Sequence, residues 1–297
     1  MDYQRLGKSD LHISRIGFGC MSLKPGAPEN ETVIQQAVEA GINLFDTADL
    51  YDKGANEEFL GKALKEKRKE VIIASKAGNQ WKADGSGWIW NPRKGYILAC
   101  AEKSLQRLQT DYIDLYQLHG GTMDDPIDET IEAFEQLKAE GKIRYYGISS
   151  IRPNVIREWV KRSNIFSVMT QYSLLDRRPE EETLPLLQEK NIGLLARGGL
   201  AQGLLIDKPA KSYLNHDGAT VENVAKTVAS LSTKERTPVQ TALQFILRHP
   251  AVTSAVVGMR TPAQLKEAMA ALSAKLSDEE FRHLQDAVLP NVYSDHR

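Results

Sequence analysis

Short apolar runs alternate with amphipathic segments along most of the chain. The runs contain few charged residues, as expected for parallel strands that are covered on both faces. Gly41 and Gly141 stand just before two of the runs, where the end of a preceding helix favours glycine. The predicted strands span residues 16–19, 42–45, 71–76, 113–118, 143–148, 168–171, 192–197 and 254–257.

The segments between these runs carry apolar residues at the spacing of an amphipathic helix. In one of them Val33, Ala37 and Val38 fall on a single face. The C-terminal helical segment, 277–289, opens with a capping box formed by Ser277 and Glu280. The predicted helices span residues 31–40, 56–65, 96–108, 127–140, 153–162, 180–190, 221–231, 239–248, 262–272 and 278–288.

Eight strands alternating with helices predict an α/β fold of the (β/α)8 TIM-barrel type, with extra helices near the C-terminus. Such a barrel commonly occupies about 250 residues, so we expect one domain over residues 1–297, led by a β-hairpin over residues 1–14. The connections 78–95 and 198–218 are unusually long, and long connections are often functional; we expect the first to be irregular. A doubly wound parallel sheet is the alternative, disfavoured because no Gly-x-Gly-x-x-Gly follows a strand.

The composition indicates which kinds of molecule the protein could bind. With 41% apolar and 26% charged residues, the chain can bury a sizeable core, and its net charge of −1 provides no broad basic field for nucleic acid or membrane. No apolar stretch approaches the roughly 18 residues that cross a bilayer, and no signal peptide opens the chain, so we expect a cytoplasmic protein. Cys20 and Cys100 lack the spacing of a disulfide framework or thiolate metal site. Small molecules are therefore the expected partners.

Ionisable side chains stand at the ends of three predicted strands. Asp46, Lys76 and His119 each follow an apolar run, and Tyr51 comes five residues after Asp46. In a barrel, the carboxyl ends of the strands line one pocket, so these groups should converge. The alternatives are a plain Asp–Lys ion pair with a packed tyrosine and histidine, or a metal site from His119, Asp46 and Asp49. No second histidine has ligand spacing, so we predict no metal.

The sequence around these residues resembles that of the aldo-keto reductases, and it is most similar to the bacterial branch of the family. The resemblance rests on Phe-Asp-Thr-Ala-Asp-Leu-Tyr, Ala-Ser-Lys and Leu-Tyr-Gln-Leu-His, and it extends from about Tyr3 to Ala271. It implies that Asp46, Tyr51, Lys76 and His119 form a catalytic tetrad and that the hairpin closes the barrel floor. The Lys76 cation should lower the pKa of Tyr51, while Asp46 holds the lysine. Tyr51 could then protonate a carbonyl oxygen during hydride transfer, with His119 hydrogen-bonded to that oxygen.

The resemblance also implies a nicotinamide dinucleotide, because no tetrad residue can hold hydride. Positions that hold the carboxamide in the family match Ser149, Ser150 and Gln171, although asparagine is frequent at position 150. At position 197 many members have an aromatic residue that stacks on the nicotinamide. Arg197 could stack there as a planar cation, turn towards an anionic group of a substrate, or pair with a neighbouring acid.

Two further segments resemble cofactor-binding loops. Residues 200–205 resemble the family segment that wraps the pyrophosphate. Residues 258–267 resemble the segment that reads the adenosine 2′-phosphate. Among the matched positions of this second segment only Arg260 is basic, so the implied cofactor is NADPH, with NADH possible. The matching positions are Gly198, Leu200, Gln202, Gly203, Gly258, Arg260, Gln264 and Glu267.

The predicted function is NADPH-dependent reduction of aldehydes and ketones to alcohols, with Tyr51 as the general acid. The alternative is a nicotinamide-binding regulatory subunit with little turnover, as in channel-associated members of the family. Trp88 and Trp90, in the connection after Lys76, should form an apolar wall for the substrate if that segment is extended; otherwise they pin the connection to the barrel.

Overall fold

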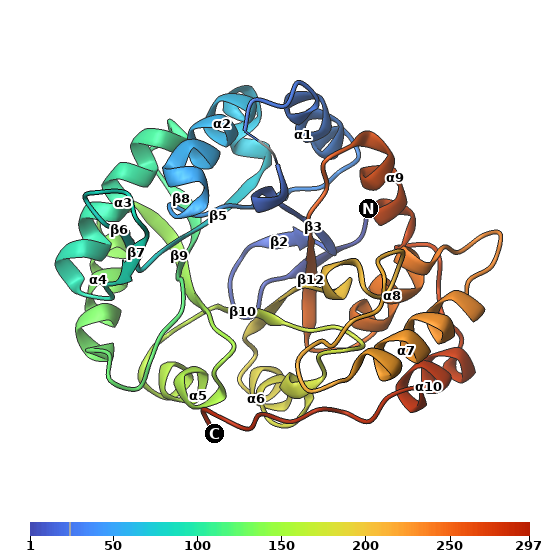
Figure 1. Cartoon of the computed structure of the whole chain (residues 1–297). Helices are drawn as coiled ribbons and strands as arrows, with labels where there is room; N and C mark the ends of the chain where they lie inside the picture. Colours follow the sequence, from blue (N-terminus) through green and yellow to red (C-terminus); the bar gives the residue numbers. More distant parts are fainter. Residues whose placement is uncertain (24) are drawn as a thin grey trace.

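Eight parallel strands close into a barrel in the computed structural model, which describes residues 1–23 and 25–297. Around the barrel the strands follow one another in chain order, and the last pairs with the first, which confirms the predicted (β/α)8 topology (Figure 1). The barrel strands are β3 (Ile16–Gly19), β4 (Leu44–Asp46), β5 (Ile72–Ala77), β8 (Ile113–Leu118), β9 (Ile143–Ser149), β10 (Ser167–Gln171), β11 (Gly193–Arg197) and β12 (Val252–Val257).

Helices surround the barrel on the outside (Figure 1). They are α1 (Glu29–Glu39), α2 (Ala55–Ala63), α3 (Lys94–Leu108), α4 (Ile127–Ala139), α5 (Pro153–Arg162), α6 (Thr183–Glu189), α7 (Gly218–Ser230), α8 (Pro238–Leu247), α9 (Pro262–Ala270) and α10 (Asp278–Asp286). Two helices follow β11 and two follow β12, as expected for extra helices near the C-terminus. Ser277 and Glu280 form the predicted capping box of α10.

Helix α6 begins later than predicted. We expected a helix from residue 180, but α6 begins at Thr183, because Arg178–Glu180 forms a separate 3-10 turn, η4. The Glu180 carboxylate there accepts hydrogen bonds from Tyr172 and Arg177, at 2.8 and 3.0 Å. These side-chain bonds hold Glu180 against the barrel instead of in the first turn of a helix.

The core has an outer and an inner layer. Between strands and helices, the ring of Phe134 packs on Tyr116, Tyr146 and Trp159, with centroid distances of 5.5 to 6.0 Å. Inside the barrel a separate apolar cluster joins inward-facing strand residues to the leading hairpin. The strand residues of this cluster are Leu44, Ile72, Ala74, Leu115, Met169, Leu195 and Val256.

The leading hairpin closes one end of the barrel. Strands β1 (Tyr3–Arg5) and β2 (His12–Ser14) pair antiparallel, and Leu6, Leu11 and Ile13 join the inner cluster. Gly7, at φ +52°, lies so close to the backbone of Phe166, Asn191 and Gly193 that a Cβ there would approach them within 2.8 Å. Phe166 and Gly193 stand at the amino ends of β10 and β11, so the hairpin forms the floor and leaves the carboxyl ends open.

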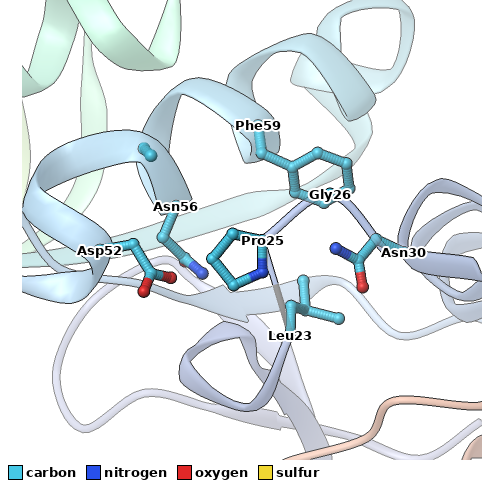
Figure 2. A pocket seen from close by; sticks show the side chains of 8 residues that line it. Leu23, Pro25, Gly26, Asn30, Asp52, Asn56 and Phe59 are labelled. Atoms are coloured by element: carbon cyan, nitrogen blue, oxygen red, sulfur yellow. The ribbon is translucent and has the colours of Figure 1, made fainter. Parts of the chain in front are cut away.

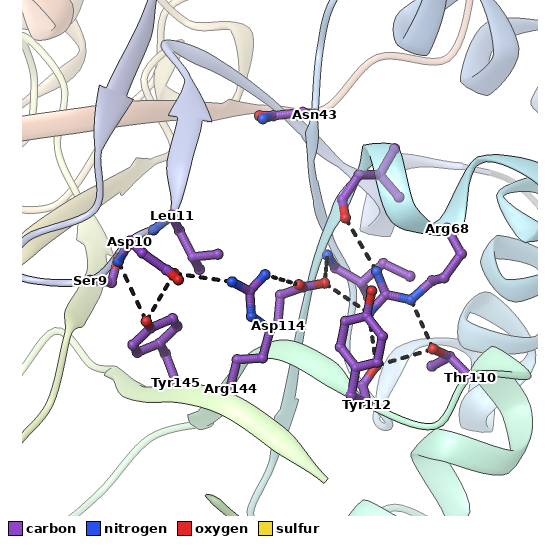
Figure 3. A network of polar contacts seen from close by, with 12 residues as sticks. Ser9, Asp10, Leu11, Asn43, Arg68, Thr110, Tyr112, Asp114, Arg144 and Tyr145 are labelled. Carbon is purple, nitrogen blue, oxygen red and sulfur yellow. Dashed lines mark hydrogen bonds and ion pairs between the residues drawn. The ribbon is translucent and has the colours of Figure 1, made fainter. Parts of the chain in front are cut away.

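Charged residues near the floor are paired with one another (Figure 3). The buried Asp114 carboxylate contacts Arg68 at 2.8 Å and Arg144 at 3.0 Å, and it accepts the backbone N–H of Ile73. Arg144 continues the network to Asp10 in the hairpin turn, at 3.0 Å. These groups therefore serve to hold the floor in place.

The connection over residues 78–95 is not irregular, contrary to the prediction. Strands β6 (Asn79–Trp81) and β7 (Trp88–Trp90) form an antiparallel hairpin in which Trp81 pairs with Trp88, and α3 begins at Lys94. Cross-strand aromatic pairs stabilise such hairpins, and the turn contains Gly85 at φ +71°. The other long connection contains the 3-10 turn η5 (Ala201–Gly203) before α7 begins at Gly218.

Three further 3-10 turns lie between the elements already named. They are η1 (Cys20–Ser22), η2 (Tyr51–Gly54) and η3 (Lys65–Glu70). Of these, η2 is the next element after β4 and begins with the candidate acid, Tyr51.

Candidate active site

Polar side chains ring the open end of the barrel. Strand residues alternate between the two faces of a sheet, and the inner apolar cluster identifies which residues face inward. A residue two or four positions along a strand lies on the same face. Polar residues stand two positions after the inward-facing Leu44, Ala74, Met169 and Leu195, and His119 stands four positions after Leu115. Asp46, Lys76, His119, Gln171 and Arg197 therefore face the mouth of the barrel, as Ser149 does at the end of β9.

The Lys76 ammonium is the centre of this ring. It is 1% exposed and lies 2.8 Å from both a carboxylate oxygen of Asp46 and the backbone oxygen of Thr47, and 3.2 Å from the hydroxyl oxygen of Tyr51. The second oxygen of Asp46 is 2.7 Å away. All four predicted tetrad residues thus come together, because the His119 ring meets Tyr51 edge-on with a centroid distance of 5.9 Å.

Sequence reasoning missed the part played by Thr47. Its carbonyl is a third acceptor for Lys76, and its hydroxyl donates to the side-chain oxygen of Asn56 at 2.8 Å. Asn56, at the start of α2, in turn donates to the carbonyl of Cys20 at 3.0 Å. A backbone acceptor leaves no residue-type signal, so only the structure could identify it.

Tyr51 has a pKa above its ordinary value, not below it as predicted. Burial of the phenol raises the pKa more than the nearby Lys76 charge lowers it, and Asp46 adds to the rise. Burial alone would lower the pKa of Lys76, but Asp46 and Tyr51 together raise it above its ordinary value. At neutral pH the phenol therefore holds its proton beside a charged lysine, the arrangement required of a proton donor.

His119 is neutral at physiological pH. Burial, with the charges of Lys76 and Arg197, lowers its pKa to about 3. The ring is partly exposed at the mouth, whereas its Nδ1 is buried and has no hydrogen-bond partner among the described residues. A neutral ring with its proton on Nε2 can donate to an oxygen held at Tyr51.

Arg197 lies at the end of β11, half-buried and facing the tetrad. Its charge acts on Asp46, Tyr51 and His119, although more weakly than burial does. Among residues 1–23 and 25–297, its guanidinium forms no ion pair and no side-chain hydrogen bond. The alternative of a salt bridge to a neighbouring acid is therefore wrong, and the cation remains available to a ligand.

The positions matched to the carboxamide lie beside the tetrad. Ser149 and Ser150 are buried at the end of β9, and the Ser150 hydroxyl accepts the backbone N–H of Arg152 at 3.2 Å. Gln171 pairs with Arg197 across β10 and β11, and Gly198, at φ +73°, follows directly. These five positions share one side of the mouth.

The two segments that resemble phosphate-binding loops follow different strands, β11 and β12. In η5, Gln202 and Gly203 adopt positive φ angles of 61° and 92°, just after the half-buried Leu200. The exposed Gly258 and Arg260 lie between β12 and α9, and the backbone N–H of Arg260 donates to Gln264 at 2.8 Å.

Glu267 has a structural partner. Its carboxylate accepts a hydrogen bond from the Thr237 hydroxyl at 2.8 Å, and Thr237 is the N-cap of α8. The Glu267 side chain is thus already engaged in linking α8 to α9.

Two cavities flank the loop that carries Tyr51. The larger, about 620 Å³, is lined by Leu50, Lys53, Trp81 and Trp88, among others. The smaller, about 110 Å³, is mainly apolar and lies beside Asn56 (Figure 2). Its lining residues are Leu23, Pro25, Gly26, Asn30, Asp52, Ala55, Asn56 and Phe59.

The two tryptophans of β7 have different surroundings, although the segment is extended as the wall hypothesis required. Trp88 is 50% exposed and borders the larger cavity. Trp90 is half-buried, its indole N–H donates to Asp125 at 2.7 Å, and its ring lies over Gly78 and Gly120. These contacts hold the hairpin on the rim beside His119.

No helix in the described part of the chain is long and apolar enough to cross a membrane. Residues 1–23 and 25–297 also contain no cluster of three or more His, Cys, Asp or Glu side chains that could hold a metal ion. Asp46 is paired with Lys76, and Asp49 faces Cys100 instead, with 2.9 Å between carboxylate oxygen and sulfur.

Comparison with known proteins places this geometry in a family. Residues 15–288 match the model described as the Aldo/keto reductase family. The chain is 49% identical to the uncharacterized oxidoreductase YqkF of Bacillus subtilis, with all of both chains covered, and 32% identical to the NADH-specific methylglyoxal reductase of Escherichia coli, covering 93% of this chain and 94% of that one.

A solved structure is similar over its whole length. The holo form of aldo-keto reductase AKR11C1 from Bacillus halodurans superimposes with a TM-score of 0.94 at 50% identity, covering 100% of this chain and 99% of that one. The family match spans most of the chain, and the relatives named here are oxidoreductases or aldo-keto reductases. The chain therefore belongs to the aldo/keto reductase family, and it is an NAD(P)H-dependent oxidoreductase.

Proposed function

We propose that this enzyme reduces aldehydes and ketones to alcohols with NADPH, and that Tyr51 donates the proton. The observation that carries the proposal is the buried Lys76 ammonium, which is hydrogen-bonded to Asp46 and Tyr51 together. A bound nicotinamide cofactor supplies a hydride to the carbonyl carbon. Tyr51 gives its proton to the carbonyl oxygen, and Lys76 stabilises the phenolate that remains.

His119 has the complementary role in this proposal. A neutral ring can donate a hydrogen bond from Nε2 to the same oxygen while negative charge develops there. Its pKa of about 3 supports the role, because an imidazolium beside the charged Lys76 would be strongly disfavoured. In the reverse direction the same residues would oxidise an alcohol.

The cofactor assignment rests on residues of this chain that suit a dinucleotide. Arg197 is a cation without an ion-pair partner among the described residues. Gln171 is its neighbour on β10, and Ser149 lies at the end of β9, one strand further on. The exposed Arg260 could meet a 2′-phosphate with a forked contact, which favours NADPH over NADH. The name of the Escherichia coli relative specifies NADH, so the choice between cofactors has to be measured.

We further propose a preference for aldehydes with hydrophobic bodies. Trp88 and Trp81 line the cavity of about 620 Å³ beside the Tyr51 loop, and aromatic walls favour apolar ligands. Lys53 lies over the Trp81 ring, 5.2 Å from its centroid, which helps to keep that wall in place.

The test of the proposed mechanism is Tyr51→Phe, assayed by NADPH oxidation with a generic aldehyde. We expect the rate to fall by about 10²-fold or more, the scale of general acid catalysis, with NADPH affinity in fluorescence titration little changed. Tyr96→Phe is the matched control. That phenol lies nearby and donates to the carbonyl of Asn79 at 3.2 Å, outside the tetrad, so this variant should retain its rate. If Tyr51→Phe retained its rate as the control does, Tyr51 would not be the proton donor.

A further inference from the structure

A row of inward-facing positions crosses four neighbouring strands just beneath the mouth. Ser167 on β10 pairs with Gly147 on β9, Gly147 pairs with Gln117 on β8, and Gln117 pairs with Lys76 on β5. Lys76 faces the barrel interior, and residues paired in register share a face of the sheet. Ser167 and Gln117 therefore also face the interior, below the tetrad.

The polar groups of this row are buried without partners. Gln117 and Ser167 are both 0% exposed. Within residues 1–23 and 25–297, neither amide atom of Gln117 nor the Ser167 hydroxyl has a hydrogen-bond partner. Buried polar groups are nearly always hydrogen-bonded to protein or to ordered water, so three unpaired groups in one row indicate a ligand that bonds to them.

Gly147 brings the two side chains towards each other. A Cβ on Gly147 would come within 2.4 Å of the Ser167 hydroxyl oxygen, so this hydroxyl occupies the place of a side chain at position 147. Position 147 is the direct neighbour of Gln117. Hydroxyl and amide therefore border the same part of the interior, with three donors and two acceptor atoms between them.

His119 closes this space from above. It follows Gln117 by two positions and shares its face, and its Nδ1 is a further buried atom without a partner in the described chain. If the proton sits on Nε2, as donation to a substrate oxygen requires, Nδ1 is an acceptor and needs a donor. The Gln117 amide and the Ser167 hydroxyl lie beneath the ring, where they can bind a molecule that supplies this donor.

We propose that Gln117 and Ser167 hold an internal water molecule under His119 and that this water donates to Nδ1. The water accepts from the Gln117 amide or the Ser167 hydroxyl, which gives it the two to four polar partners typical of buried water. The bond fixes the tautomer with the proton on Nε2. Gln117 is thus a positioning residue for His119, and its effect on catalysis rests on the function proposed above.

The direct test is the tautomer of His119, read from the ring 15N shifts of the holoenzyme. The wild type should show one neutral tautomer, protonated on Nε2. Gln117→Leu should give a mixture, and Ser167→Ala a smaller change in the same direction. Thr170→Val is the control, because Thr170 lies next to the inward-facing Met169 and so faces away from the interior. An unchanged single tautomer in folded Gln117→Leu would overturn the proposal.

The kinetic test separates this role from packing. In Gln117→Leu we expect kcat to fall by about 10-fold to 10²-fold, less than the 10²-fold to 10³-fold typical of removing an oxyanion donor outright, with KM for the cofactor unchanged. Gln117→Glu, protonated and neutral in the interior, should restore part of the rate. A melting temperature lowered with kcat intact would assign Gln117 to folding alone. The 15N readout needs no turnover, so it remains decisive even if Tyr51→Phe shows that the proposed mechanism is wrong.

Discussion

The Lys76–Asp46 pair allows stability and catalysis to be separated experimentally. Both side chains are almost fully buried, so Lys76→Met leaves a carboxylate at 4% exposure without its cation. Breaking a buried pair from one side typically costs about 3–5 kcal/mol, whereas replacing both partners is often nearly neutral. We therefore expect Lys76→Met to lower the free energy of unfolding by about 3–5 kcal/mol, and the double variant with Asp46→Asn to lower it by less than about 2 kcal/mol.

The assay is urea unfolding at neutral pH for the wild type, both single variants and the double variant. An exposed pair gives the control: Lys67 and Glu70 are 53% and 59% exposed, and Lys67→Met should cost no more than about 1 kcal/mol. Carbonyl reduction should stay low in every variant that lacks Lys76, including the double variant, because Tyr51 has lost its cation. The reasoning is refuted if the double variant is as unstable as the sum of the two single variants.

Three further predictions concern pH, cofactor and substrate. The pKa of His119 is lowered to about 3, so acidification from pH 6.5 to 3 should reduce the free energy of unfolding by about 1.4 kcal/mol per pH unit. The pKa of Asp49 is raised to about 6, so protonation of this carboxylate should instead increase the free energy of unfolding as the pH falls from about 6 to about 4. Urea unfolding of Asp49→Asn should therefore show a steeper acid loss than the wild type; parallel curves would contradict this. Arg260→Ala should weaken NADPH binding by about 1.5–3 kcal/mol and leave NADH nearly unaffected in fluorescence titrations, and equal losses would mean that Arg260 does not read the 2′-phosphate. Trp88→Ala should reduce kcat/KM for a long aliphatic aldehyde much more than for a very small one, whereas Trp90→Ala should mainly lower Tm; parallel losses for both substrates in Trp88→Ala would assign that ring to folding.

The sequence was sufficient for the barrel and for the convergence of the tetrad. Strand ends are marked by short apolar runs, and once eight such runs alternate with helices, Asp46, Lys76 and His119 must meet at the carboxyl end of the barrel. The β6–β7 hairpin was missed although two β-prone runs flank a Gly-containing turn. Its tryptophan-rich strands were too short to stand out from an irregular loop.

Other features depend on surroundings that residue types do not encode. The pKa of Tyr51 is raised because desolvation outweighs the charge of Lys76, and the extent of burial is known only after folding. In the same way, the sequence does not indicate that Glu267 accepts a hydrogen bond from Thr237, 30 positions away in the chain. Gln117 could be identified only from the structure, in which its amide is buried and has no partner among the described residues.

The barrel floor has a consequence for how the chain is made. Gly7 packs against the backbone of Asn191 and Gly193, and the backbone oxygen of Arg15 accepts the N–H of Ala255. The hairpin residues therefore find their contacts only after about two thirds of the chain, and finally β12, has been synthesised. During that interval Leu6, Leu11 and Ile13 have no interior to enter. Closure of the floor is therefore expected late in synthesis, and the apolar side chains of the nascent hairpin stay exposed until then.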